Sequence, residues 1–212
     1  MEAKPLLHAI STGKQSIDRL VDTARGIHPF VQAIHIREHD KSAREVYKIG
    51  KRLLTGGVPP GKIIINNRVD AAIALGVKGV QLGFHSLPVE VVKSVFPSLS
   101  VGKSVHSFQE AMQAEKEGAD YILYGHVFPT NSKDGIAPKG MEELQKVTYH
   151  LNIPVIAIGG IKQKNVVKTM DTKVTGIAVL SGIFNAVDPI RAAKDYADIL
   201  VNGDDFTNEE GL

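Results

Sequence analysis

Short apolar runs bounded by Gly, Pro or Asn recur along the chain, and each is followed by a stretch in which apolar residues repeat with helical spacing. We interpret the short runs as strands. They are Leu6–Ile10, Val31–Arg37, Lys62–Asn66, Gly79–Gly83, Ser100–Ser104, Tyr121–His126, Val155–Gly159 and Gly176–Ser181.

The intervening stretches carry the signals of helices. Arg44–Leu54 places its apolar residues on one side and its basic residues on the other, which predicts an amphipathic helix. Ser107 precedes Phe108–Gly118 as the expected N-cap, and Glu110 stands three residues later, where a capping box needs it. A glycine then closes this second helix.

The last predicted helix begins at Pro189, with Asp188 as its cap, and runs to about Val201. Strand and helix thus alternate, which requires parallel strands joined by helical crossovers. Eight such units predict a single-domain α/β fold, a (β/α)₈ or TIM barrel over residues 1–201, with a doubly wound open sheet as the alternative. Residues 202–212 are acidic and are expected to form a flexible C-terminal tail.

Length, charge and composition exclude several classes of function. The 212 residues are enough for one sizeable core, and 25 basic and 23 acidic residues are spread along the chain, with a net charge of +2. No basic stripe is available, so nucleic acid and membrane surfaces are not expected partners. There is no Cys, which excludes disulfides, thiolate nucleophiles and thiolate metal sites. Neither a signal peptide nor a membrane span is recognisable, so a cytoplasmic location is expected.

In parallel folds ligands meet the carboxyl ends of strands, and two neighbouring ends are rich in glycine. Gly159 and Gly160 close the seventh predicted strand, and Ser181 and Gly182 close the eighth. Backbone N–H groups at such ends can converge on an anion, and the loops after strands seven and eight are the usual phosphate site of these barrels. The alternative is that these glycines only make tight turns.

Three other strand ends are polar. Arg37, with His35 pointing the same way, suits a carboxylate or phosphate, unless it only forms an ion pair with Glu38. Asn67 follows the third strand and is interpreted as a possible helix cap. His126 ends the sixth strand and is able to take and give a proton near neutral pH, although a structural role is the common one for a lone His. No metal-spaced cluster of carboxylates and His is recognisable at these ends.

An ordered set of motifs resembles the thiamine phosphate synthase superfamily over nearly the whole chain. The motifs are Ile36-Arg37-Glu38, Ile65-Asn66-Asn67-Arg68-Val69-Asp70, Gly102-Lys103-Ser104-Val105-His106, Gly118-Ala119-Asp120-Tyr121, Pro129-Thr130 with Lys133, Ala157-Ile158-Gly159-Gly160-Ile161 and Val179-Leu180-Ser181-Gly182-Ile183. The resemblance implies the barrel and the phosphate site.

The chain departs from the synthases at three places. Synthases join a pyrimidine pyrophosphate to thiazole phosphate, and they carry a Lys and two Asp residues where this chain has His39, Asn67 and Ser86. The resemblance makes the Asp residues the Mg²⁺ ligands, and Mg²⁺ prefers carboxylate oxygen, so loss of synthase activity is expected. Gly125-His126-Val127-Phe128 resembles instead the TenI-type thiazole tautomerases, which isomerise carboxythiazole phosphate in thiamine biosynthesis.

That resemblance implies a proton shift, without a cofactor or metal, on a small phosphorylated thiazole. His126 would act as base and then as acid, Arg37 would hold the carboxylate, and Asn66 would orient the carboxylate or the ring. Ser104 would line the ring pocket. The residues expected to hold the phosphate are Gly159, Gly160, Ser181 and Gly182.

Two other functions remain open on the sequence. One is a thiamine phosphate synthase with altered metal ligands, and the other is a non-catalytic regulatory barrel that binds a phosphorylated ligand. His126 separates the last from a tautomerase, because a binding protein does not need a titrating group at a strand end. His106 is the alternative base. A homo-oligomer is compatible with all three functions.

Overall fold

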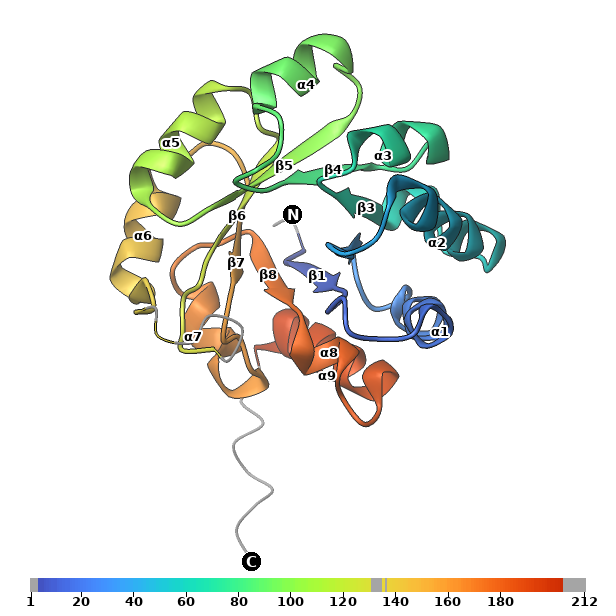
Figure 1. Cartoon of the computed structure of the whole chain (residues 1–212). Coiled ribbons are helices and arrows are strands. Elements are labelled where there is room, and N and C mark those ends of the chain that lie inside the picture. Colours follow the sequence, from blue (N-terminus) through green and yellow to red (C-terminus); the bar gives the residue numbers. More distant parts are fainter. Residues whose placement is uncertain (1–3, 131–134, 136, 204–212) are drawn as a thin grey trace, which may run out of the picture.

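The computed structural model describes residues 4–130, 135 and 137–203. Its eight strands pair in chain order, all in parallel, and β1 also pairs with β8, so the sheet closes into a barrel surrounded by helices (Figure 1). The predicted (β/α)₈ barrel is confirmed, and the open doubly wound sheet is wrong. The strands are β1 (Leu6–Ile10), β2 (Ala33–Ile36), β3 (Ile63–Asn66), β4 (Gly79–Leu82), β5 (Ser100–Val105), β6 (Tyr121–Gly125), β7 (Val155–Ile158) and β8 (Gly176–Val179).

The helices follow the strands and cover the outside of the barrel (Figure 1). They are α1 (Ile17–Ile27), α2 (Ala43–Thr55), α3 (Val69–Leu75), α4 (Val89–Val95), α5 (Phe108–Lys116), α6 (Gly140–His150), α7 (Val166–Met170), α8 (Ser181–Phe184) and α9 (Pro189–Asn202), with the 3₁₀ turns η1 (Pro60–Lys62) and η3 (Gln163–Asn165).

Every predicted strand is present, but most end one or two residues away from the predicted position, and the ends of β2 and β8 have identifiable causes. The ladder of β2 ends before Arg37, because the Arg37 N–H donates to the Ser11 hydroxyl oxygen at 2.8 Å. Strand β8 ends at Val179, because Leu180 leaves the extended conformation, with φ −105° and ψ −88°, and Ser181 begins α8. Both differences place polar groups at the carboxyl ends of the strands.

The predicted helix starts are largely confirmed. Ser107 caps α5 by accepting a hydrogen bond from the Glu110 N–H at 3.2 Å. The expected return bond is wrong, because the Glu110 carboxylate accepts from the N–H of His106 at 2.7 Å and not from that of Ser107. Asp188 caps α9, which ends in the left-handed Gly203 with φ 64°. Residues 204–212 of the predicted tail lie outside the described residues.

Two apolar clusters hold the fold together. The larger one lies between the sheet and the surrounding helices and includes Leu20, Ile49 and Leu144. The smaller one fills the barrel and contains Ile10, Ala33, Ile64, Tyr121, Leu123, Ile156 and Ala178. Burying a Leu or Ile side chain contributes roughly 1.5–3 kcal/mol, so these clusters dominate the stability of the barrel that positions the strand ends.

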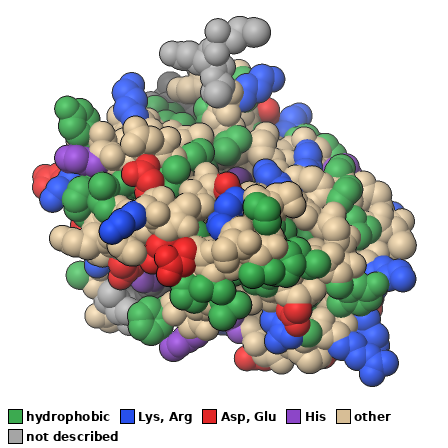
Figure 2. All heavy atoms as spheres, turned by 90° about the horizontal axis from the view of Figure 1, so that it is seen from above, with side chains coloured by type: hydrophobic (Ala, Val, Ile, Leu, Met, Phe, Trp, Pro, Cys, Tyr) green, Lys and Arg blue, Asp and Glu red, His purple; other side chains and the backbone are tan. Residues whose placement is uncertain are grey.

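The surface is mixed in character. Figure 2 shows basic and acidic side chains interspersed on the face in view, with small groups of hydrophobic side chains between them. Within the described part of the chain, no helix combines the length and the apolar character that a membrane crossing requires.

Candidate active site

The closed parallel barrel brings the predicted site residues to one mouth. Arg37 follows β2, Asn66 ends β3, Ser104 lies near the end of β5, and His126 follows β6. Strands β2 and β6 are four positions apart around the ring of eight, so Arg37 and His126 flank the mouth from opposite sides. A ligand that reaches both residues must therefore lie across the mouth.

His126 lies against the glycines that follow β7. Its side chain is 4% exposed, and a Cβ at Gly159 would overlap the Cβ of His126. The N–H groups of Val127 and Phe128 donate to the carbonyls of Ile158 and Gly159, each at 3.0 Å, so the segment after His126 runs beside the loop after β7. The candidate base and the candidate phosphate loop are therefore in direct contact.

The loop after β7 requires glycine for backbone reasons. Gly159 and Gly160 have φ values of 96° and 69°, which side chains rarely adopt. A Cβ at Gly160 would lie 2.6 Å from the carbonyl oxygen of Pro129 and 2.7 Å from the Cβ of Phe128. The backbone conformation and the close packing therefore account for a glycine at both positions, and phosphate binding at the same loop stays a prediction.

Ser181 and Gly182 begin α8 at the end of the neighbouring strand. The first helical bonds of α8 are donated by Ile183 and Phe184 to the carbonyl of Leu180, so the N–H groups of Ser181 and Gly182 precede this ladder. Both residues are exposed. Exposed N–H groups beside a hydroxyl are suitable donors for an anion.

Arg37 is held at the rim through its backbone. The Ser11 hydroxyl, at the end of β1, accepts from the Arg37 N–H and donates to the Glu38 carboxylate at 2.7 Å. Glu38 is buried and its other oxygen lies 3.9 Å from Lys41, so the predicted structural role of Arg37 as the ion-pair partner of Glu38 is not the arrangement found. Partial burial lowers the pKa of Arg37, against the opposing effect of Glu38, and the residue is half-buried.

Asn66 lies above a pair of buried histidines. His8 Nδ1 and His35 Nε2 are 3.0 Å apart inside the barrel, where the side chains of His8 and His35 are 3% and 0% exposed. Burial lowers the pKa of His35 to about 3, while the Asn66 side chain opposes that shift as a hydrogen-bond acceptor. The Asn66 oxygen and His35 Nδ1 are both buried, and neither has a fully formed hydrogen bond among the described residues, so the Asn66 oxygen is the acceptor nearest to that ring nitrogen.

The three departures from the synthase pattern follow three neighbouring strands, β2, β3 and β4, and two of them, Asn67 and Ser86, are in contact. Asn67 has φ 62° and is not a helix cap, because Arg68 occupies that position of α3. The Asn67 Oδ1 accepts from the Ser86 hydroxyl at 2.8 Å and from the N–H of Gly83 at 3.1 Å. Burial and the Arg37 charge lower the pKa of His39, so its imidazole is a poor substitute for the cationic Lys.

These residues do not fit a magnesium site of the kind implied by the synthases. An amide oxygen that already accepts two hydrogen bonds and a hydroxyl replace two carboxylates. Within residues 4–130, 135 and 137–203, no three His, Asp or Glu side chains come together as metal ligands. Hard Mg²⁺ prefers carboxylate oxygen, so the donor set here is unfavourable. Lys133 of the family motif lies outside the described residues.

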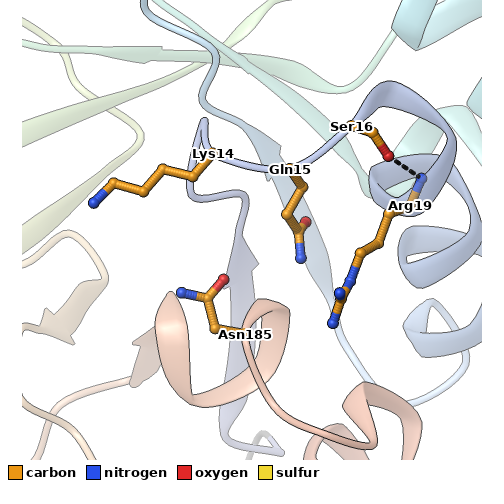
Figure 3. A pocket seen from close by; sticks show the side chains of 5 residues that line it. All are labelled: Lys14, Gln15, Ser16, Arg19 and Asn185. Atoms are coloured by element: carbon orange, nitrogen blue, oxygen red, sulfur yellow. Dashed lines mark hydrogen bonds between the residues drawn. The ribbon is translucent and has the colours of Figure 1, made fainter.

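An open hollow of about 470 Å³ lies between the end of α8 and the segment that follows β1 (Figure 3). It is lined by Lys14, Gln15, Ser16 and Arg19 of the loop after β1 and the start of α1, and by Asn185 after α8. The Gln15 side chain lies in the hollow (Figure 3), and its amide nitrogen donates to the Phe184 carbonyl at the end of α8. None of the predicted site residues lines this hollow.

The sequence did not predict the residues inside the barrel whose side chains hydrogen-bond the predicted site residues. Ser11 holds Arg37, and Gln81 Nε2 donates to the Ser104 hydroxyl oxygen at 3.0 Å. Gln81 and Tyr121 are buried inside the barrel. The available signal was a polar residue within an apolar strand, as in Val80-Gln81-Leu82, because a buried polar side chain needs a partner.

Comparison with known proteins agrees with this architecture. The model of the thiamine monophosphate synthase (TMP-TENI) family matches residues 7–183. A thiamine-phosphate synthase of Pyrococcus furiosus is 42% identical over 170 residues, which cover 79% of this chain and 82% of that protein. A thiamine-phosphate synthase of Desulfitobacterium hafniense is 37% identical over 191 residues, which cover 87% of this chain and 91% of that protein.

Solved structures give the same result. A thiamine phosphate pyrophosphorylase from Pyrococcus furiosus superimposes with a TM-score of 0.80 at 35% sequence identity, covering 92% of this chain and 95% of that one. A 3-hexulose-6-phosphate synthase, at 16% identity and a TM-score of 0.69, shares the fold. The family match, the identity to relatives and the barrel described above agree: the chain belongs to the thiamine monophosphate synthase family.

Proposed function

We propose that the protein is a thiazole tautomerase that converts carboxythiazole phosphate into its aromatic tautomer. The observation that carries the proposal is the contact between His126 and Gly159, which places a proton-transferring side chain beside the candidate phosphate loop. A titratable group at that position suits a reaction in which a proton moves on a ligand held by its phosphate.

In this mechanism the substrate lies across the mouth of the barrel. The backbone N–H groups of Gly160, Ser181 and Gly182 would hold the phosphate, and the Arg37 guanidinium would hold the carboxylate with Asn66 beside it. Phosphate and carboxylate would thereby be fixed at separate strand ends, which leaves the thiazole ring between them. Such fixation supplies the proximity and orientation that proton transfer requires.

His126 would move the proton. Its imidazole takes a proton from the ring carbon that bears the carboxylate, and the electron pair shifts through the ring toward the exocyclic carbon. The imidazolium then returns a proton to that exocyclic carbon. Atoms and charge balance, the exocyclic double bond is lost, and the ring becomes aromatic. Arg37 would balance the negative charge of the carboxylate throughout.

Thiamine-phosphate synthase is the second candidate, because the relatives at 37–42% identity bear that name. The hydrogen-bonded Asn67 and Ser86 argue against it, since they stand where the synthases are expected to carry carboxylates. The lowered pKa of His39 also removes a cation that would favour a pyrophosphate.

The test is to supply the purified protein separately with the two sets of substrates. With the non-aromatic carboxythiazole phosphate, we expect ultraviolet absorption and NMR to report enzyme-dependent aromatisation. With pyrimidine pyrophosphate, thiazole phosphate and Mg²⁺, we expect no thiamine phosphate. Synthesis at about 1 s⁻¹ or faster, a typical turnover, would establish the second candidate instead. Binding of the thiazole phosphate without either reaction would identify a binding protein.

A further inference from the structure

Three buried or half-buried polar side chains form a column beneath the mouth, on the neighbouring strands β4, β5 and β6. Gln81 and Tyr121 are both paired with Gly102 in the sheet register, so they lie at the same level on either side of it. Ser104 is two residues further along β5 and is therefore on the same face, one layer closer to the mouth. Gln81 and Tyr121 are 1% and 7% exposed.

Gly102 leaves the space in which these side chains meet. A Cβ at this position would overlap Gln81 Oε1 and the Tyr121 ring, and would lie 2.5 Å from the Tyr121 hydroxyl oxygen. The Gln81 and Tyr121 oxygens therefore border the same small space inside the barrel. Neither oxygen has a formed hydrogen bond among the described residues. A phenol and an amide oxygen at such positions are a donor and an acceptor for each other, directly or through one water.

The Tyr121 hydroxyl lies where it can set the orientation of the Gln81 amide. Burial, with a smaller contribution from Asp120, raises the pKa of Tyr121, so the phenol keeps its proton and has to donate it. Gln81 Oε1 borders the same space as the phenol, and a bond between the two, direct or through one water, would hold Gln81 Nε2 toward Ser104. That nitrogen donates to the Ser104 hydroxyl oxygen at 3.0 Å. Ser104 consequently accepts from below and keeps its own proton for a partner at the mouth.

We propose that Tyr121 and Gln81 are positioning residues that fix Ser104 as a hydrogen-bond donor to the substrate, and that the group it contacts is an unprotonated ring nitrogen. The inference rests on the proposed function, in which a thiazole ring lies between the phosphate and carboxylate sites. A serine held as a donor favours a heteroaromatic ring with an acceptor nitrogen over the same ring without one, because the latter would leave the buried polar group unpaired.

The test is a double-mutant cycle on the affinity for the aromatic carboxythiazole phosphate, measured by calorimetry. Tyr121→Phe and Ser104→Ala should each weaken binding roughly 2- to 10-fold, the range for one hydrogen bond, and the double variant should bind no more weakly than Ser104→Ala. A thiophene analogue lacks the ring nitrogen, and none of the three variants should bind it more weakly than the unmodified protein does. If Tyr121→Phe does not fold, as judged by its melting temperature, Gln81→Met takes its place in the same cycle.

Effects that multiply in the double variant, or a Tyr121→Phe variant with unchanged affinity for the thiazole, would overturn the inference. So would equal losses for the thiophene analogue, because a merely structural role of Tyr121 would disturb both ligands alike. If the unmodified protein neither binds nor isomerises the thiazole, the proposed function fails together with this inference. Binding and turnover without coupling between Tyr121 and Ser104 would remove this inference alone.

Discussion

Lowering the pH should destabilise the protein through the buried histidine pair. His35 is completely buried, and burial lowers its pKa from the ordinary value of 6.5 to about 3. The pKa of His8 is also lowered, first by burial and then by His35. The unfolded chain takes up these protons below about pH 6.5, whereas the folded chain takes up the His35 proton only near pH 3. The shifted pKa of His35 therefore has little effect on the free energy of unfolding above pH 6.5, and it lowers that free energy progressively as the pH drops from 6.5 toward 3.

The expected size follows from this difference in pKa. Between pH 7 and pH 5, a site that shifts from about 6.5 to about 3 on folding costs about 2 kcal/mol of unfolding free energy. His8 adds to the loss in the same direction. A loss of this size is a large fraction of the 5–15 kcal/mol that is typical of a folded domain.

Urea unfolding of the unmodified protein and of His35→Gln at pH 7 and pH 5 measures the effect. Gln cannot titrate but keeps a hydrogen-bonding group for His8. Comparing each protein with itself at the two pH values removes the effect of the substitution on packing. We expect the unmodified protein to lose about 2 kcal/mol more than His35→Gln between the two pH values. Equal losses in both proteins would refute the reasoning, because His35 would then titrate alike in the folded and unfolded states.

Two further predictions test the anion site and the barrel interior. Ser181→Glu should weaken the binding of the phosphorylated thiazole at least 10-fold, because it places a like charge beside the phosphate. Ser94→Glu on α4 is the control and should leave the affinity unchanged. Calorimetry measures both affinities, and equal values would contradict the assignment of the anion site. Gly102→Ala should lower the unfolding free energy by roughly 1–3 kcal/mol in urea titrations, because its Cβ would overlap Gln81 and Tyr121. An unchanged urea midpoint would show that the space between these two side chains can hold a methyl group.

The barrel was predictable because its signals are local. Eight apolar runs separated by amphipathic stretches determine parallel strands, and caps such as Ser107 and Asp188 place the helix starts. The predicted positions of the strand ends were less accurate, because a strand end depends on side chains from other strands. Ser11 ends the ladder at Arg37 from 26 positions away, and nothing near Arg37 in the sequence announces that contact.

The site was predictable where position in the fold determines it. Carboxyl ends of strands identify Arg37, Asn66 and His126 as facing one mouth. The supporting residues were not predictable, because their roles depend on register: Gln81 and Tyr121 come together only because both pair with Gly102. Likewise, Asn67 looked like a helix cap until the contact with Ser86, which lies 19 positions away, gave it a different role.

The central claim is that His126 moves the proton, and the most direct test is the rate of aromatisation of carboxythiazole phosphate by His126→Asn. We predict a fall in kcat of about 10²- to 10⁴-fold, the range for a general acid–base group, with unchanged affinity for the aromatic product. His106→Asn is the matched control, because His106 lies close by with its Nδ1 2.7 Å from the Gly125 carbonyl oxygen. A His126→Asn variant with normal kcat, or the full loss in His106→Asn instead, would contradict the mechanism.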